Sequence, residues 1–149
     1  MTRYSLIALT LLSIVGCGPK NSGGAGSNEK MTAQAPTPTE LAAYAGHATY
    51  PSSQQANNDL RAAAVVSPNR DAIKIYNFTA QPLRSVDVWI NGAYVQHVAG
   101  IPPQGSVTVR STDLYNGLGK SFASQQEPVS RVQVKTSDGF YNVMGPASE

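Results

Sequence analysis

The hydrophobic positions of this chain fall into one long N-terminal run and a series of short runs after Leu60. The short runs are rich in Val, Ile and Tyr, and turn-forming Gly, Pro, Asn and Asp residues separate them. None of them has the 3.6-residue period of an amphipathic helix. The pattern predicts strands at Ala62–Val66, Ala72–Thr79, Ser85–Ile90, Ala93–Val98, Ser106–Arg110, Arg131–Thr136 and Phe140–Met144.

Seven short strands at this spacing are typical of a small β-sandwich or barrel. We expect an all-β, Ig-like antiparallel sandwich over residues 59–149, which follows a disordered N-terminal tether. A domain of this length can form one core without a metal or a disulfide. Ala62–Ala64 within the first strand also fits a helical turn.

Asn91-Gly92 separates two of the predicted strands and indicates a tight hairpin. A two-residue Asn-Gly loop favours a type I′ turn, because both positions need a positive φ. The expected register pairs Ile90 with Ala93, Trp89 with Tyr94, Val88 with Val95 and Asp87 with Gln96.

One face of this hairpin is the candidate binding face, formed by Asp87, Trp89, Tyr94 and Gln96. An aromatic pair beside a carboxylate and an amide can stack on a sugar ring and bond its hydroxyls, and aromatic residues are favoured at protein interfaces. Alternatively, the pair only braces the hairpin, a contribution of about 0.2–1 kcal/mol, and the segment around Tyr44 covers it. Both interpretations stay open on the sequence.

Asp138-Gly139 predicts a second hairpin, with Val134 opposite Val143 and Thr136 opposite Tyr141. The stretch Ser111–Pro128 is long for a connection in a small domain, which is typical of a functional or irregular loop.

The N-terminal apolar run, Leu6–Val15, has the features of a signal peptide. Arg3 precedes it, and its length falls within the usual range of roughly 7–15 residues. It is too short to span a bilayer, which takes about 20 apolar residues. Ile14-Val15-Gly16 leads directly into Cys17, the only cysteine of the chain. A buried core helix would leave Gly16-Cys17-Gly18-Pro19 without a role.

Residues 1–20 resemble the lipobox signal of bacterial lipoproteins. The resemblance implies that residues 1–16 are removed and that the Cys17 sulfur receives a diacylglycerol whose acyl chains, such as palmitate, hold the protein to a membrane of the cell envelope. It also implies the outer membrane where the source has one, because Gly18 is not the aspartate that retains many lipoproteins in the inner membrane. The resemblance carries no information about the folded domain.

Residues 17–58 predict the lipidated cysteine and a flexible tether. Asn21–Asn28 and Pro51–Asn58 have the small and polar composition of flexible linkers. Thr39–Gly46, between them, predicts a short helix that Thr39 caps and that is marginal unless Tyr44 docks on something.

Charge argues against nucleic acid as a partner. The full chain has 11 basic and 9 acidic residues. Loss of residues 1–16 removes one basic residue, Arg3, and leaves 10 minus 9, or +1. Proteins that bind nucleic acid usually present a clustered basic face. Lipidation of Cys17 would also leave the mature chain without a thiol for disulfides or metal ligation.

No residue pattern supports catalysis, a cofactor or a metal site. The two histidines are His47 and His97, whereas a zinc site takes three or four ligands. Neither a GxSxG elbow nor a GxxxxGK[ST] loop is present. We therefore expect a non-enzymatic module that binds a protein or glycan of the envelope. The alternatives are a structural or assembly lipoprotein that pairs through a sheet edge and, remotely, a small hydrolase that uses His97.

Overall fold

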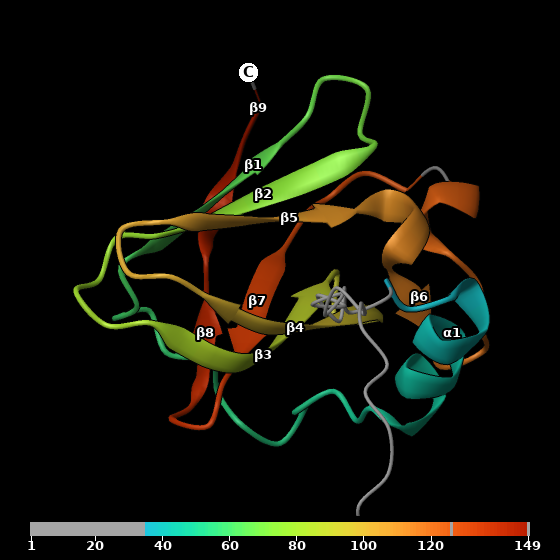
Figure 1. The fold of residues 1–149 in the computed structure, drawn as a ribbon, viewed down its shortest axis with the longest axis horizontal. Coiled ribbons are helices and arrows are strands. Elements are labelled where there is room, and N and C mark those ends of the chain that lie inside the picture. Colours follow the sequence, from blue (N-terminus) through green and yellow to red (C-terminus); the bar gives the residue numbers. More distant parts are fainter. Residues whose placement is uncertain (1–34, 126, 149) are drawn as a thin grey trace, which may run out of the picture. The chain divides into compact units, whose positions relative to one another are not determined.

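The computed structural model describes residues 35–125 and 127–148, in which two β-sheets pack against each other (Figure 1). The all-β sandwich predicted from the sequence is confirmed. Cys17, the rest of the lipobox signal and the first part of the expected tether lie outside the described residues.

The described residues form nine strands, one α-helix and two short 3-10 helices. The strands are β1 (Ala62–Val66), β2 (Ala72–Asn77), β3 (Leu83–Ile90), β4 (Tyr94–Ile101), β5 (Ser106–Arg110), β6 (Tyr115–Asn116), β7 (Val132–Lys135), β8 (Phe140–Asn142) and β9 (Met144–Ser148). The helices are α1 (Pro38–His47), η1 (Ser111–Asp113) and η2 (Phe122–Ser124).

The strands form a four-stranded sheet of order β5-β2-β1-β9 and a five-stranded sheet of order β6-β4-β3-β7-β8. Neighbouring strands are antiparallel, except that β9 runs parallel to β1. The predicted bounds of β1 and β5 are confirmed.

The prediction of seven antiparallel strands was wrong in two places. The first is β6, whose two residues are too short to give an alternating pattern. It lies with η1 and η2 in the stretch predicted as a long loop. The second is the predicted last strand, which divides at Val143. The residues before Val143 pair with β7 in one sheet, and those after it pair with β1 in the other.

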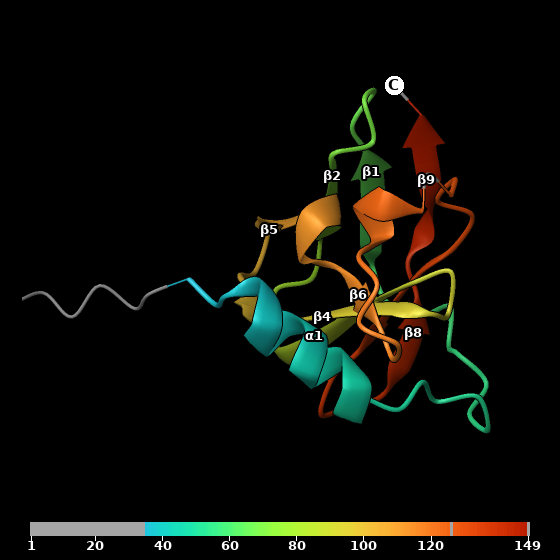
Figure 2. The same ribbon diagram turned by 90° about the vertical axis from the view of Figure 1, so that its right-hand side faces the viewer.

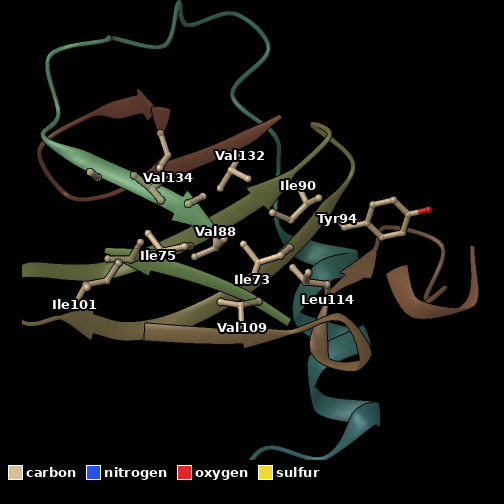
Figure 3. Close-up of a cluster of buried hydrophobic side chains, with 14 of the residues drawn as sticks. Ile73, Ile75, Val88, Ile90, Tyr94, Ile101, Val109, Leu114, Val132 and Val134 are labelled. Carbon is tan, nitrogen blue, oxygen red and sulfur yellow. The ribbon is translucent and has the colours of Figure 1, made fainter. Parts of the chain in front are cut away.

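Inward-facing side chains of both sheets form the main core (Figure 3). The core follows the two-residue alternation of strands: Ile73 and Ile75 are buried, and Lys74 between them is exposed. Full burial of a Val or Ile side chain contributes about 1.5–3 kcal/mol. The buried members are Ala62, Ala64, Ile73, Ile75, Val86, Val88, Ile90, Tyr94, Ile101, Val109, Leu114, Phe122, Val132, Val134 and Val143.

A second cluster lies on the outer face of the five-stranded sheet. Trp89, Val95 and Phe140 point outward from this sheet, and Ala45 of α1 is buried against them. Partly buried residues of the segment after the helix complete the cover, Tyr50 among them. Figure 2 shows α1 beside β4 and β6, the two strands that it contacts. An element that the sequence assigned to the tether therefore covers one face of the domain.

The helix begins at its own capping signal, two residues before the predicted cap. The Thr37 hydroxyl accepts a hydrogen bond from the Glu40 N–H at 3.3 Å, and the Glu40 carboxylate accepts one from the Thr37 N–H at 2.7 Å. This reciprocal capping box, with Pro38 in the first turn, fixes the start. The C-cap is Ala48, not Gly46.

The predicted domain boundary at residue 59 was wrong, because α1 and the segment after it already belong to the compact unit. The polar run Pro51–Asn58 is joined to the sheet by main-chain hydrogen bonds. The Asn57 N–H donates to the Phe140 carbonyl at 2.9 Å, and the Asn142 N–H donates to the Asn57 carbonyl at 2.8 Å. Composition alone resembled a linker, but these bonds and the apolar cover make the segment part of the domain.

The predicted register of the first hairpin was wrong by one residue. Asn91 and Gly92 have φ values of 54° and 70°, and the Ala93 N–H donates to the Ile90 carbonyl, so the predicted tight turn is present. Ala93 is nevertheless left out of the ladder, and Ile90 lies opposite Tyr94. A shift of one residue exchanges the two faces of a strand.

The second hairpin differs from its prediction by two residues, which leaves its faces unchanged. Val134 lies opposite Tyr141 instead of Val143, and Lys135 lies opposite Phe140. The loop is longer than Asp138-Gly139 because Thr136 leaves the ladder and its N–H bonds the Gly139 carbonyl.

Candidate functional site

The four residues of the predicted binding face do not share a surface. Trp89 and Tyr94 are each only 3% exposed and lie on opposite faces of the five-stranded sheet. Tyr94 packs in the main core, with its ring 5.0 Å from that of Phe122. Gln96 lies opposite Val88, with its Oε1 buried and without a partner among the described residues. The prediction of this face was wrong because the extra residue Ala93 reversed the alternation of β4.

Asp87, the fourth residue of that set, lies at the surface and holds α1 to the sheet. Its Oδ1 accepts a hydrogen bond from the Tyr44 hydroxyl at 2.5 Å and lies 2.8 Å from His97 Nδ1. The rings of Tyr44 and His97 lie 5.4 Å apart. Partial burial and the Asp87 carboxylate raise the pKa of Tyr44 well above its ordinary value. Tyr44, Asp87 and His97 therefore join α1 to the five-stranded sheet, and we call these three residues the latch.

A polar groove of about 430 Å³ lies on the same side of the domain as the second cluster. The Tyr50–Asn58 segment forms one wall, and outward positions of β7 and β8 form the other. We call it the amide groove, because five of its side chains are carboxamides. Its lining is Tyr50, Pro51, Ser52, Gln54, Gln55, Ala56, Asn58, Arg131, Gln133, Phe140 and Asn142.

A chain of hydrogen bonds fixes the floor of the amide groove. The Tyr50 hydroxyl donates to Gln133 Oε1 at 2.7 Å, and Gln133 Nε2 donates to Asn142 Oδ1 at 2.8 Å. Asn142 Nδ2 then donates to Asn58 Oδ1 at 2.8 Å. Gln133 is only 4% exposed, and both ends of its amide have partners, as a buried amide requires.

Aromatic rings support the Tyr50 wall from below. The Tyr50 ring meets Trp89 and Phe140 edge-on, with centroid distances of 5.3 and 5.7 Å. The Arg131 guanidinium lies 5.9 Å from the same ring. Arg131 is the one charged side chain in the lining of the groove. The other polar side chains there are neutral hydrogen-bond donors and acceptors.

A second hollow of about 590 Å³ lies between the β1–β2 loop and the η1 and η2 region. Arg70, Asp71 and Glu127 give it both signs of charge. The Ser67 hydroxyl donates to the Asp71 carboxylate and holds the pKa of Asp71 below its ordinary value. The buried Ser111 hydroxyl donates to the Arg70 carbonyl. These bonds hold the β1–β2 loop together and join it to η1.

Within residues 35–125 and 127–148, no group of three or more His, Cys, Asp or Glu side chains is placed to hold a metal ion. No helix in the same ranges has the length and apolar character needed to cross a membrane. Comparisons with protein families, with curated proteins and with solved structures found no match to this chain.

The residues of the amide groove were not predicted from the sequence. Gln133 stands between two valines of a strand, where alternation already predicts an outward polar residue. The amides of the 51–58 segment look like linker composition. The density of Gln and Asn in that segment is the one signal that could have indicated a site.

Proposed function

We propose that this chain is a lipid-anchored protein of the cell envelope whose β-sandwich is a non-catalytic module that binds a neutral, hydroxyl-rich ligand, such as a glycan, in the amide groove. The observation that supports this proposal is the fixed chain of side-chain hydrogen bonds that runs from the Tyr50 hydroxyl through three carboxamides, Gln133, Asn142 and Asn58.

Carboxamides suit such a ligand because each carries an acceptor oxygen and an NH2 group with two donor hydrogens. Sugar hydroxyls also donate and accept. The floor of the groove is held by its own hydrogen bonds, so a ligand does not have to order it, which lowers the cost of binding. The volume of about 430 Å³ falls within the range of small-molecule sites.

The lipid anchor rests on the lipobox signal that ends at Cys17. A diacylglycerol on this cysteine would place the domain at a membrane surface. The position after it, Gly18, favours the outer membrane in a cell that has two membranes. We expect Cys17→Ser to release the protein from the membrane fraction, and continued tight membrane association would contradict the anchor.

Edge pairing is the second candidate, and one observation favours it. β5 has β2 as its only described ladder partner, so its other edge is open to a strand from a partner. Prolines and charged side chains discourage pairing at sheet edges. The strand has both, with Pro102 and Pro103 before it and the exposed Arg110 at its end, which counts against this candidate.

A hydrolase has the weakest support. Among the described residues the side-chain partners of His97 are Asp87 and Tyr44, and neither is the serine that a Ser/His/Asp site would use.

The binding proposal is tested by ligand-observed NMR with neutral hexose and N-acetylhexosamine oligomers, on the full chain carrying Cys17→Ser. Asn58→Asp keeps the oxygen that accepts from Asn142 but removes the donor and adds a negative charge. We expect at least about a tenfold weaker affinity, the effect of losing roughly 1.4 kcal/mol.

Gln81→Glu is the matched control, because Gln81 is exposed and the hydrogen bonds of this residue use its main chain. It should leave binding unchanged. Absence of binding by every oligomer, or equal loss in both variants, would overturn the proposal.

A further inference from the structure

The outer face of the four-stranded sheet is a second surface with its own chemistry, which we call the sheet platform. In both views α1 lies away from β1 and β2 (Figures 1 and 2). The platform is open to solvent at several positions, with Phe78 42% exposed. Its residues, from the ladders and the alternation of the strands, are Arg61, Ala63, Val65, Lys74, Tyr76, Phe78, Ser106, Thr108 and Arg110.

Three exposed cations lie on the platform: Arg61, Lys74 and Arg110. The one ion pair among the described residues is the distant Asp87–His97 pair, so no described carboxylate pairs with them. Asp59, Asp71 and Asp113 are the nearest carboxylates along the chain. The Asp71 carboxylate already accepts hydrogen bonds from Ser67 and Asn69 within the β1–β2 loop.

Two aromatic rings lie among these cations. The rings of Tyr76 and Phe78 are parallel within 4°, with centroids 6.0 Å apart. The ammonium of Lys74 lies 4.9 Å from the centre of the Tyr76 ring. The platform thus combines positive charge with aromatic groups, which are favoured at the interface between a membrane and water.

The exposure of Phe78 is enforced by its buried neighbour Asn77. The Asn77 amide donates to the Gln81 carbonyl at 2.8 Å and to the Pro102 carbonyl at 3.1 Å, and its oxygen accepts from the Thr79 N–H at 2.9 Å. Gln104 also donates to the Phe78 carbonyl at 2.8 Å. The corner is held firmly, so the phenyl ring is presented to solvent by the fold.

The platform is a sheet face outside both described hollows, which favours an extended partner over a small molecule held in a pocket. Neither of the two hollows described above includes any of its residues in the lining. A polymer strand such as an anionic polysaccharide is usually held in a groove, whereas a bilayer surface needs none. Charge complementarity then points to acidic headgroups.

We propose that the sheet platform docks the domain on an anionic phospholipid surface. The inference rests on the proposed function in one respect. The lipid on Cys17 would tether the domain to the membrane and so raise its effective concentration at the bilayer surface, enough for a weak contact to form. The amide groove lies on the outer face of the other sheet. Docking would therefore leave it directed away from the membrane and open to ligand.

The test measures binding of the full chain carrying Cys17→Ser to vesicles rich in phosphatidylglycerol and to vesicles of phosphatidylcholine alone. The unlipidated chain keeps the result independent of the anchor and of the groove, and residues 1–16 contribute equally to every variant. A basic side chain near an anionic surface contributes about fivefold in partitioning, so Arg61→Gln, Lys74→Gln and Arg110→Gln together should weaken binding about 100-fold.

The matched control neutralises three exposed cations elsewhere, with Arg84→Gln, Lys120→Gln and Lys135→Gln. This control variant has the same net charge as the platform variant. It should bind the vesicles nearly as tightly as the chain that carries Cys17→Ser alone. Equal loss in both triple variants would overturn the proposal, as would equal binding to both kinds of vesicle. Tighter capture by a soluble anionic polysaccharide than by the vesicles would assign the platform to that class instead.

A second measurement uses the lipidated protein and does not depend on partitioning. An environment-sensitive dye on Thr108→Cys, in protein anchored through Cys17, should shift to the blue in phosphatidylglycerol vesicles and not in phosphatidylcholine vesicles. A dye on Ser53→Cys, in the exposed segment of the groove side, should not shift. If the emission of the dye on Thr108→Cys does not shift in either kind of vesicle, the proposal is also overturned.

Discussion

The two sheets of the sandwich have outer faces of opposite character. The five-stranded sheet presents Trp89, Val95 and Phe140, which are buried under α1 and the segment that follows it. The four-stranded sheet presents small, charged and aromatic residues that are exposed or half-buried. The inner faces of both sheets are alike in their dense packing of Val and Ile. Which outer face is covered therefore depends on a few large apolar side chains at outward positions.

The largest expected effect concerns the covered face. Trp89→Ala removes the ring on which Tyr50 packs and leaves a cavity below the cover. We expect a loss of about 3–5 kcal/mol in the free energy of unfolding, measured by urea denaturation. Hydrogen exchange should also rise in α1 and the 48–56 segment. A loss below about 1 kcal/mol would show that the cover contributes little to the fold.

A smaller effect is expected at the latch that holds the cover in place. Tyr44→Phe removes the hydrogen bond to Asp87 and should cost about 1 kcal/mol at neutral pH. Because the folded state raises the pKa of Tyr44, wild type keeps this stability below the ordinary tyrosine pKa of about 10 and loses it as the pH rises further.

The difference between wild type and Tyr44→Phe should therefore shrink in urea denaturation as the pH rises above about 10. Burial also raises the pKa of Tyr94, but that residue is present in both proteins and cancels in the comparison. A difference that stays constant or grows with pH would contradict the bond to Asp87.

The smallest effect is expected on the open face. Phe78→Ala removes a ring that is 42% exposed and stacked only on Tyr76 among the described rings. We expect a change within about 0.5 kcal/mol, as for most surface substitutions. Measured beside Trp89→Ala, it tests whether the two outer faces differ in their contribution to stability. A loss as large as that of Trp89→Ala would remove the distinction.

The sequence predicted the sheet content well because alternation and turn residues are local signals. β1 and β5 lie at their predicted bounds. The hairpin register depended on whether Ala93 joins the ladder, and neither the Asn-Gly motif nor the apolar pattern determines that. One residue there was enough to bury Tyr94 in the core and to remove the predicted binding face.

The segment from residue 35 to 58 shows the second limit of prediction. Its cover residues are small or isolated, such as Ala45, Ala48 and Tyr50, and they follow no regular period. Their burial depends on Trp89 and Phe140, which come much later in the chain. The amide groove could not be predicted for the same reason, since its two walls are distant in sequence.

The chain crosses from one sheet to the other between β8 and β9, and this crossing affects how the domain folds. β9 pairs with β1, the first of the described strands, so the four-stranded sheet is complete only when both are available. Contacts between such distant segments form late and slow the folding of β proteins. The four-stranded sheet should therefore be completed late in refolding, after the β3–β4 hairpin, whose two strands a tight turn joins.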